Sequence, residues 1–165
     1  MQKHEAEKQF EKHLRENELL IYKVCRLYAY SEADRQDLFQ EIVIQLWKAY
    51  PKFKGQSKFS TWIYRVALNT AITGLRKQKV FIVSYEPAAL PQHIDVNTGL
   101  EEEAQLKVLH KAIEQLNQVE KAIVMLYMED KTYEEMEDIM GISQGNLRVK
   151  MNRIKEKLRQ ITKTD

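Results

Sequence analysis

The spacing of apolar residues constrains the fold of this chain most, because it is helical in two long stretches and is lost between them. Apolar side chains recur every three or four positions from Phe10 to about Lys79, and the same spacing returns between residue 104 and Leu158. Only five Gly and three Pro occur in the 165 residues, which is too few turn residues for a protein of many strands. The sequence therefore predicts an all-α fold.

The segment at residues 81–103 divides the chain into two halves. It lacks helical spacing, contains Pro87, Pro91 and Gly99, and ends in three consecutive Glu residues that suit the first turn of a following helix. We expect two small helical domains, at residues 1–80 and 104–165, joined by residues 81–103 as a flexible linker.

Two helices of the N-terminal half carry polar stripes beside their apolar faces. After a polar break at residues 31–34, one helix is expected from Asp37 to Tyr50, where Pro51 stops it, and another from Phe59 to Lys79. The first stripe, which taken alone is typical of solvated surface, consists of Asp37, Gln40, Glu41, Gln45 and Lys48. The second consists of Thr61, Arg65, Asn69, Thr73 and Arg76. The intervening residues, with Gly55 and Ser57, form a loop.

The C-terminal half contains three helix-start signals in close succession. Asn117 with Glu120, and Thr132 with Glu135, match the capping box, in which a side-chain oxygen caps the N3 amide and the N3 carboxylate reaches back. Ser143 is a good N-cap residue without an acidic partner at N3. The sequence thus predicts a helix start at each of the three places.

The last two of these signals enclose a helix-turn-helix pattern. A two-turn helix from Tyr133 to Met140 ends at Gly141, and a second helix follows Ser143 and runs to about Leu158. Two short helices joined by a Gly turn also occur in many bundles that bind no DNA. The Ser143 cap, the turn glycine and six Lys or Arg residues on the second helix together favour DNA binding.

Basic side chains gather in two windows although the net charge is only +2. Residues 51–79 contain seven Lys or Arg and no acid, and residues 143–163 contain seven against Glu156 alone. Residues 81–103 hold five acids and no Lys or Arg. Two separated basic surfaces indicate a polyanion that is bound at two places.

No constellation of catalytic or metal-binding residues is found in the sequence. The four His are scattered, none has a Ser or Cys nucleophile near it in a recognisable motif, and the five Gly never cluster into a phosphate-binding loop. Cys25 is the only cysteine, which excludes an internal disulfide and argues against a dedicated zinc site. We therefore expect no enzymatic activity, no cofactor and no metal.

The apolar runs of the sequence are short. The longest, Ala122–Met128, falls well below the roughly 20 residues that a membrane span needs, and the chain starts without an apolar signal region. We expect a cytoplasmic protein without membrane insertion.

Two sequence blocks together resemble one protein family. The run FKGQSKFSTWIYRVALNTAITGLRK (53–77), preceded by DLFQEIVIQLWKAYPKF (37–53), resembles the second conserved region of bacterial sigma factors. The run YEEMEDIMGISQGNLRVKMNRIKEKLR (133–159) is similar to their fourth region. The two blocks stand in the expected order, and the chain has no room for the other regions of a primary sigma factor. The resemblance is therefore to the extracytoplasmic-function (ECF) group.

The resemblance implies roles for specific residues in the first half. The helix with the first polar stripe is similar to the one that docks on core RNA polymerase, which implies binding by Asp37, Gln40, Glu41, Gln45 and Lys48. The following loop is similar to the one that captures a base flipped from the melted non-template strand of the minus-ten element, and the helix after it is similar to the one that reads the upstream edge of that element. The residues implied are Phe53, Lys54, Gly55, Ser57, Lys58, Phe59, Trp62, Arg65, Asn69 and Thr73. Trp62 is equally well interpreted as a buried core residue.

In the second half, the family makes its contacts to the minus-thirty-five element early in the second helix of the motif. The residues implied here are Asn146, Arg148, Val149, Lys150, Asn152 and Arg153, with Lys150 nearer the phosphates. The chain departs from the family pattern at Asn117, at Asn146 and at Glu137, which replaces a small residue and so questions the tight packing of the first helix. Val149 and Asn152 mean that the base preference cannot be taken from relatives.

The interpretation that accounts for both blocks is an ECF-type sigma factor. It would bind core RNA polymerase, recognise two promoter elements and assist promoter opening, with promoter DNA as duplex and as melted strand among its partners. An anti-sigma factor is a further partner to test for. One alternative is a helix-turn-helix regulator that acts without entering the polymerase, and another is a helical adaptor that binds only protein. The block at residues 53–77 separates them, since a regulator needs no loop for single-stranded DNA.

Overall fold

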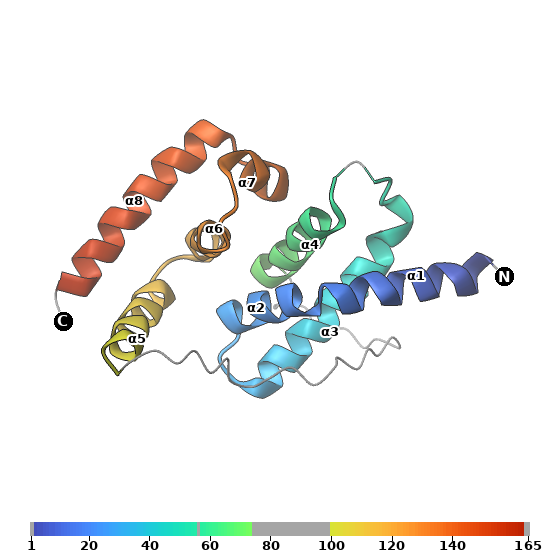
Figure 1. Cartoon of the computed structure of the whole chain (residues 1–165), viewed down its shortest axis with the longest axis horizontal. Helices are drawn as coiled ribbons and strands as arrows, with labels where there is room; N and C mark the ends of the chain where they lie inside the picture. The colour runs from blue at the N-terminus through green and yellow to red at the C-terminus, as the bar shows by residue number, and fades with distance from the viewer. Residues whose placement is uncertain (1, 56, 74–99, 164–165) are drawn as a thin grey trace. The chain divides into compact units, whose positions relative to one another are not determined.

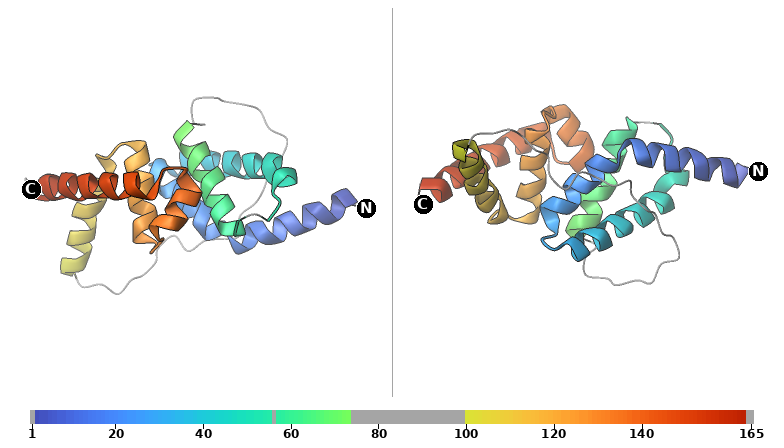
Figure 2. Two further views of the ribbon diagram at one scale, coloured as in Figure 1. Left: turned by 90° about the horizontal axis from the view of Figure 1, so that it is seen from above. Right: turned by 60° about the horizontal axis from the view of Figure 1, so that its bottom comes forward.

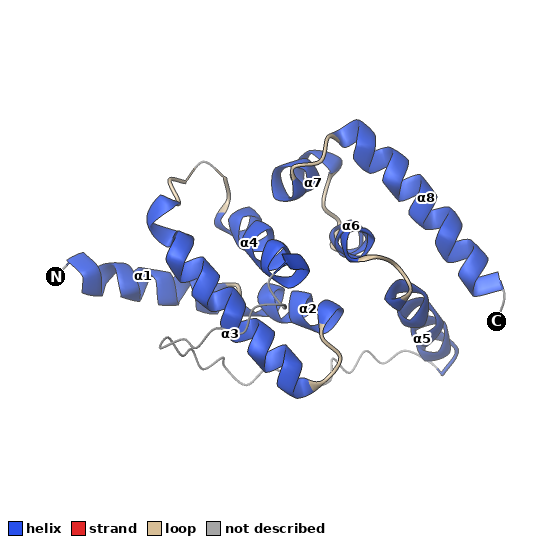
Figure 3. Cartoon of the chain, turned by 180° about the vertical axis from the view of Figure 1, so that it is seen from behind, coloured by secondary structure: helices blue, strands red, loops and turns tan. Residues whose placement is uncertain are grey.

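A computed structural model describes residues 2–55, 57–73 and 100–163 of the chain. These residues divide into two compact units, which lie within Met1–Leu90 and Pro91–Asp165. Every regular element in the described ranges is a helix, and none is a strand (Figure 3). The all-α prediction is confirmed. None of the described helices is both long and apolar enough to cross a membrane.

The first unit contains four α-helices and one 3₁₀ turn in its described part. Their bounds are α1 Gln2–Glu16, α2 Glu18–Tyr28, α3 Glu32–Ala49, η1 Tyr50–Lys52 and α4 Phe59–Thr73. Helices α2, α3 and α4 each pack against the other two, and α2 follows directly on α1 (Figures 1 and 2). The side chain of Asn17, between α1 and α2, donates a hydrogen bond of 2.8 Å to the carbonyl oxygen of His13.

The core of this unit is built from one apolar face of each helix. Its fully buried members include Leu14, Ile21, Leu38, Leu46 and Ile63. Burying such a side chain stabilises the fold by about 1.5–3 kcal/mol relative to leaving it exposed. The helical spacing in the sequence therefore identifies the surface by which these helices pack.

Helix α3 begins five residues earlier than the sequence predicts, at Glu32 and not at Asp37. The cause is Ser31, whose hydroxyl oxygen accepts the backbone N–H of Asp34 at 3.1 Å and caps the helix. The predicted stop holds, because α3 ends at Ala49 and Pro51 lies in the 3₁₀ turn that follows. The predicted helix at residues 59–79 is observed as α4, and its positions 74–79 lie outside the described residues.

The second unit is organised around its last helix. Its elements are α5 Leu100–Glu114, α6 Gln118–Met128, α7 Tyr133–Met140 and α8 Gln144–Lys163. Helix α8 contacts each of the other three through its buried residues Leu147, Met151 and Ile154 (Figures 1 and 2). It runs five residues beyond the predicted end at Leu158, and α5 begins at Leu100, inside the segment expected to be linker.

Both predicted capping boxes are confirmed in the structure. The Asn117 side chain accepts the N–H of Glu120 at 2.8 Å while the Glu120 carboxylate accepts the N–H of Asn117 at 3.0 Å. Thr132 and Glu135 make the same reciprocal pair. These bonds satisfy backbone donors that have no partner inside a helix, so the sequence places the starts of α6 and α7 correctly.

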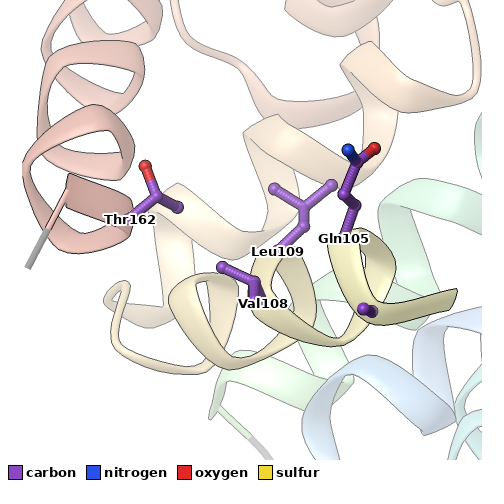
Figure 4. A pocket seen from close by; sticks show the side chains of 5 residues that line it. Gln105, Val108, Leu109 and Thr162 are labelled. Carbon is purple, nitrogen blue, oxygen red and sulfur yellow. The ribbon is translucent and has the colours of Figure 1, made fainter. Parts of the chain in front are cut away.

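Helix α5 and the last turn of α8 leave a shallow recess between them (Figure 4). Its lining consists of Ala104, Gln105, Val108, Leu109 and Thr162. None of these side chains is charged, and the exposed surface of the recess is almost wholly apolar. It therefore offers nothing that would hold a phosphate or catalyse a reaction.

Candidate functional site

The polar stripe of α3 lies opposite a broad buried face. That face consists of Leu38, Phe39, Ile42, Val43, Ile44 and Leu46. Within the stripe, Asp37 and Lys48 are exposed, whereas Gln40, Glu41 and Gln45 are half-buried. The side-chain amide of Gln45 donates a hydrogen bond of 3.1 Å to the Glu41 carboxylate. The stripe is therefore partly ordered by its own contacts and keeps a negative charge at each of Asp37 and Glu41.

A group of aromatic rings lies beneath the loop that joins α3 to α4. The rings of Phe53 and Phe59, at the two ends of the loop, meet edge to face with centroids 5.4 Å apart. Both also contact Trp62, at 5.0 and 5.3 Å. His13 of α1 stacks on Phe59 at 4.5 Å. These contacts hold the ends of the loop together, since aromatic pairs at such distances attract one another beyond their burial.

Between these rings the loop presents polar groups to solvent. Lys54, Gly55 and Lys58 are exposed, and Ser57 is half-buried. Gly55 has a φ of 71°, a left-handed conformation that residues with a Cβ rarely adopt. The loop therefore places two cations on either side of a glycine turn, above a floor of aromatic rings.

Trp62 belongs to the core and not to the surface of this site. Only 8% of the residue is exposed, and its ring contacts Tyr50 as well as Phe53 and Phe59. Of the two interpretations left open by the sequence, the structure favours the core one. Thr61, the first member of the second polar stripe, is buried as well.

The remaining described members of that stripe form a short exposed row on α4. Arg65, Asn69 and Thr73 are separated by four residues each, so they lie on one face, and all three are exposed. The Thr73 hydroxyl donates a hydrogen bond to the backbone carbonyl oxygen of Asn69, so the Thr73 side chain is held against its own helix. Arg76 lies outside the described residues.

The predicted DNA-contacting residues of α8 are all exposed. They are Asn146, Arg148, Val149, Lys150, Asn152 and Arg153. At about 100° per residue, Val149 points almost directly away from the buried arc of Leu147, Met151 and Ile154. Val149 is 49% exposed and is an apolar side chain among polar and basic ones on this face. Arg148 and Lys150 flank it on opposite sides of this face.

The cations of α8 differ in their partners within the protein. Lys155 lies over the ring of Tyr127 at 4.9 Å, and the ammonium of Lys157 lies 3.1 Å from the Glu120 carboxylate. In the described part of the chain, neither Lys150 nor Arg153 makes an ion pair or lies over a ring. When Lys150 or Arg153 binds an anion, it therefore gives up no ion pair or ring contact with the described part of the chain.

The turn from α7 to α8 is held by contacts that the sequence did not reveal. Gly141 ends α7 with a φ of 72°, and the Ser143 hydroxyl oxygen accepts the N–H of Asn146 at 3.3 Å, as predicted. In addition, the Glu137 carboxylate accepts the N–H of Gln144 at 2.9 Å. The sequence put the tightness of helix packing at Glu137 in doubt, and in the structure the carboxylate of this residue caps the first turn of α8.

Titratable groups of the described residues do not assemble into a reactive centre. No group of three or more His, Cys, Asp or Glu lies close enough to hold a metal ion within residues 2–55, 57–73 and 100–163. Burial raises the pKa of the Cys25 thiol to about 12, an effect that the Arg35 guanidinium partly opposes. A thiol with such a pKa is protonated at neutral pH and is a poor nucleophile.

In a comparison with known protein families, both halves of the chain match a family. The family described as Sigma-70 region 2 matches residues 13–80, and that described as Sigma-70, region 4 matches residues 106–158. These matches include the loop between α3 and α4, the α3 stripe, all of α7 and α8 as far as Leu158.

Whole proteins of known role are similar over most of the chain. The ECF RNA polymerase sigma factor SigW of Bacillus subtilis is 26% identical over 85% of this chain and 81% of its own length. The ECF RNA polymerase sigma-E factor of Escherichia coli K12 is 29% identical over 74% of this chain and 71% of its own length.

Two solved structures share the fold. One is CnrH in complex with the cytosolic domain of CnrY, with a TM-score of 0.67 and 16% identity over 96% of this chain and 90% of that chain. The other is the sigma factor RpoE in complex with the anti-sigma factor NepR from Bartonella quintana, with a TM-score of 0.66 and 18% identity over 96% and 99%. With two sigma-70 regions in order on two helical units, the chain belongs to the extracytoplasmic-function group of RNA polymerase sigma factors.

Proposed function

We propose that this sigma factor divides its work among three surfaces. The stripe of α3 binds core RNA polymerase through Asp37, Gln40, Glu41, Gln45 and Lys48. The loop and the exposed row of α4 bind the melted minus-ten strand, and the exposed face of α8 binds the minus-thirty-five element. Residues 1–80 then serve polymerase binding and opening, residues 104–165 serve upstream recognition, and residues 81–103 link them.

The exposed face of α8 is the observation that carries this proposal. Val149 is exposed at the centre of this face, and the exposed cations Arg148, Lys150 and Arg153 lie around it. An apolar side chain in such a place fits the methyl group of thymine in the major groove, while Arg and Asn can donate to base edges. Lys150 and Arg153 supply charge for the phosphates.

The loop between α3 and α4 supports the opening step. A flipped base has to be unstacked at a cost of a few kcal/mol, which aromatic and backbone contacts and cations near the phosphates can offset. Phe53 and Phe59 are half-buried and so keep part of their rings accessible, and Lys54 and Lys58 are exposed beside them. Trp62 supports this loop from below and does not itself touch DNA.

The proposed role needs protein partners and no catalytic group of its own. RNA polymerase performs the chemistry, so the factor acts in the cytoplasm as a binding subunit and not as an enzyme. The solved structure of the sigma factor RpoE contains the anti-sigma factor NepR. We extend this to the present chain and propose that an anti-sigma factor binds it as well.

Run-off transcription with purified core polymerase on a library of promoters tests the proposal. The wild-type chain should direct initiation at a subset of sequences that share two elements. The double variant Asp37→Lys with Glu41→Lys should lose most of this activity and should co-purify poorly with core polymerase. Its fold should persist, because Asp37 is exposed and the change at Glu41 removes one part-buried hydrogen bond, from Gln45 of the same helix, at a cost of about 1 kcal/mol.

A matched control is available on α1. The double variant Glu5→Lys with Glu7→Lys makes the same change of charge at two exposed positions of α1, outside the α3 stripe. It should bind core polymerase like the wild type. Equal binding by both double variants would contradict the assignment of the α3 stripe. Sequence-specific binding to duplex DNA without polymerase, and no initiation with it, would instead favour a simple regulator.

A further inference from the structure

Helix α7 holds the start of α8 at two points one helical turn apart. The Glu137 carboxylate accepts the backbone N–H of Gln144 at 2.9 Å. The guanidinium carbon of Arg148 lies 5.0 Å from the centre of the Tyr133 ring. Tyr133 and Glu137 are four residues apart on α7, and Gln144 and Arg148 are four residues apart on α8. Each pair therefore lies on one face of its helix, and the two faces meet.

The contact with Tyr133 distinguishes Arg148 from the other candidate DNA-contacting residues. Arg has a long side chain with many rotamers, and ordering it on DNA has an entropic cost. A guanidinium over an aromatic ring is attracted by the ring and loses part of that freedom before DNA arrives. Its N–H groups can still donate in the guanidinium plane, which is the geometry that two acceptors of a guanine require.

The surroundings of Tyr133 make this contact a defined one. Tyr133 is half-buried and stands at the first position of α7, where the Thr132 and Glu135 capping box fixes the backbone. The hydrogen bond from Gln144 to Glu137 fixes the first turn of α8 on the same side. Ring and guanidinium are thus presented by two helix ends whose relative position is set by hydrogen bonds.

We propose that Tyr133 is a positioning residue for base recognition. It holds the Arg148 guanidinium in the orientation in which Arg148 reads one base pair of the minus-thirty-five element. Tyr133 makes its contribution through Arg148 and sets the preference at that base pair, while Glu137 sets where α8 begins. This inference rests on the proposed role of α8 in upstream recognition.

The test is a promoter selection with full-length protein and core polymerase, with the minus-thirty-five element randomised. Arg148→Ala should relax the preference at one position. Tyr133→Leu should relax the preference at that same position, by roughly threefold if the contact has the strength of an exposed cation–π pair. Tyr133→Phe keeps the ring and should retain the wild-type preference. Arg148→Lys keeps the charge without the planar group and should resemble Tyr133→Leu.

A matched control uses the second ring that carries a cation of α8. Tyr127→Leu removes the ring under Lys155, two turns further along the helix, and should leave the preference unchanged. The combination of Tyr133→Leu with Arg148→Ala should be no more relaxed than Arg148→Ala alone, because both changes remove one interaction.

Separate results decide the inference and the function on which it rests. If the wild type selects no minus-thirty-five sequence, the proposed role of α8 fails. If the wild type and Arg148→Ala behave as expected, but Tyr133→Leu weakens all sequences alike, Tyr133 has only a structural role and the inference is overturned. Relaxation at a position other than that of Arg148→Ala overturns it too. Loss of preference in the well-folded Tyr133→Phe variant would also contradict it.

Discussion

At the scale of single residues, Glu137 is the clearest case of a side chain whose role depends on a distant contact. In the sequence it stands where relatives have a small residue, which suggests a disturbed packing. In the structure its carboxylate accepts a backbone N–H of the next helix and lies near the positive end of that helix dipole. The contact spans seven residues across a turn, and no helical or strand spacing would have predicted it.

The stability of the protein should respond to this contact. Glu137→Ala leaves the Gln144 N–H without its acceptor, and we expect the free energy of unfolding to fall by about 1 kcal/mol, the usual cost of losing a helix cap. Glu137→Gln keeps an acceptor oxygen and should lose less. Urea unfolding followed by circular dichroism measures both changes, and an equal loss in the two variants would contradict the capping role.

A second residue-scale prediction concerns Cys25 and pH. Burial raises the pKa of this thiol from its ordinary 9.0 to about 12. Between these values the unfolded chain releases the proton and the folded chain keeps it. The free energy of unfolding should therefore fall as the pH rises above 9, by about 1 kcal/mol per pH unit from this group.

The measurement is urea unfolding of the wild type and of Cys25→Ala at several pH values from 8 to 10.5. Burial also raises the pKa of Tyr28, so its destabilising effect begins near its ordinary 10.0 and is common to both proteins. The variant should lose less stability than the wild type between pH 9 and pH 10. Parallel curves over that interval would show that the thiol does not titrate as described.

At the scale of helices, α8 carries cations of two kinds, those that contact other groups of the protein and those that do not, and their charge alone does not distinguish them. Lys157 pairs with Glu120 of α6 and Lys155 lies over Tyr127, so these cations help to hold the unit together. Lys150 has no such contact in the described part of the chain. The sequence shows seven basic residues on this helix, and only the structure tells which of them contact other groups of the protein.

This division predicts different salt dependences for two lysines of one helix. Removing one phosphate contact with Lys150→Ala should lower the slope of log K against log salt by roughly 0.9 and weaken all promoters alike. Lys157→Ala removes a cation that is engaged with Glu120 and should change the slope less. Holoenzyme binding to one promoter at several salt concentrations provides the comparison. Equal slopes for both variants would contradict the assignment of Lys150 to a phosphate.

The helices themselves were largely predictable from the sequence, for local reasons. Asn117 and Thr132 start helices through contacts three residues away, and Gly141 ends one through its own backbone, so their effects follow from neighbouring residues. The sequence analysis did not place the start of α3 after Ser31, because the residue at N3 is Asp34 and not the Glu or Gln of a full capping box. The apolar spacing is more regular after Asp37, and the predicted start of the helix was therefore too late.

The sequence names candidate residues for the site but does not reveal the contacts that they make. The sequence identifies Phe53 and Phe59 as ends of one loop, yet it cannot show that His13 of another helix stacks on Phe59. It also left two interpretations of Trp62, because a large aromatic residue suits a core and a DNA surface equally. Spacing along one helix says which face a residue occupies and does not say which partner covers that face.

At the scale of the whole molecule, the proposed function assigns the two units to two different forms of promoter DNA. Helix α8 has the exposed polar and basic face that suits the edges of paired bases. The loop after α3 has cations and a left-handed glycine above aromatic rings, which suits a base taken out of the stack. A factor built this way has to bind duplex upstream while it stabilises unpaired DNA downstream.

Asn69, exposed on α4 ten residues after Phe59, offers a test of that division. Asn69→Ala should reduce open-complex formation at a fully paired promoter. It should matter less on a template that is already mismatched across the bubble, because the cost of unpairing has been removed there in advance. Permanganate footprinting of unpaired thymines measures opening on both templates, with Thr73→Val as a neighbouring change on the same row.

The two templates separate opening from simple binding. Replacing a residue that only holds duplex DNA would lower opening by the same factor on both templates, since the upstream duplex is identical in the two. Replacing a residue that stabilises the melted strand lowers opening most where the DNA must still be unpaired. Equal losses of Asn69→Ala on paired and mismatched templates would therefore place Asn69 in duplex binding and remove α4 from the opening step.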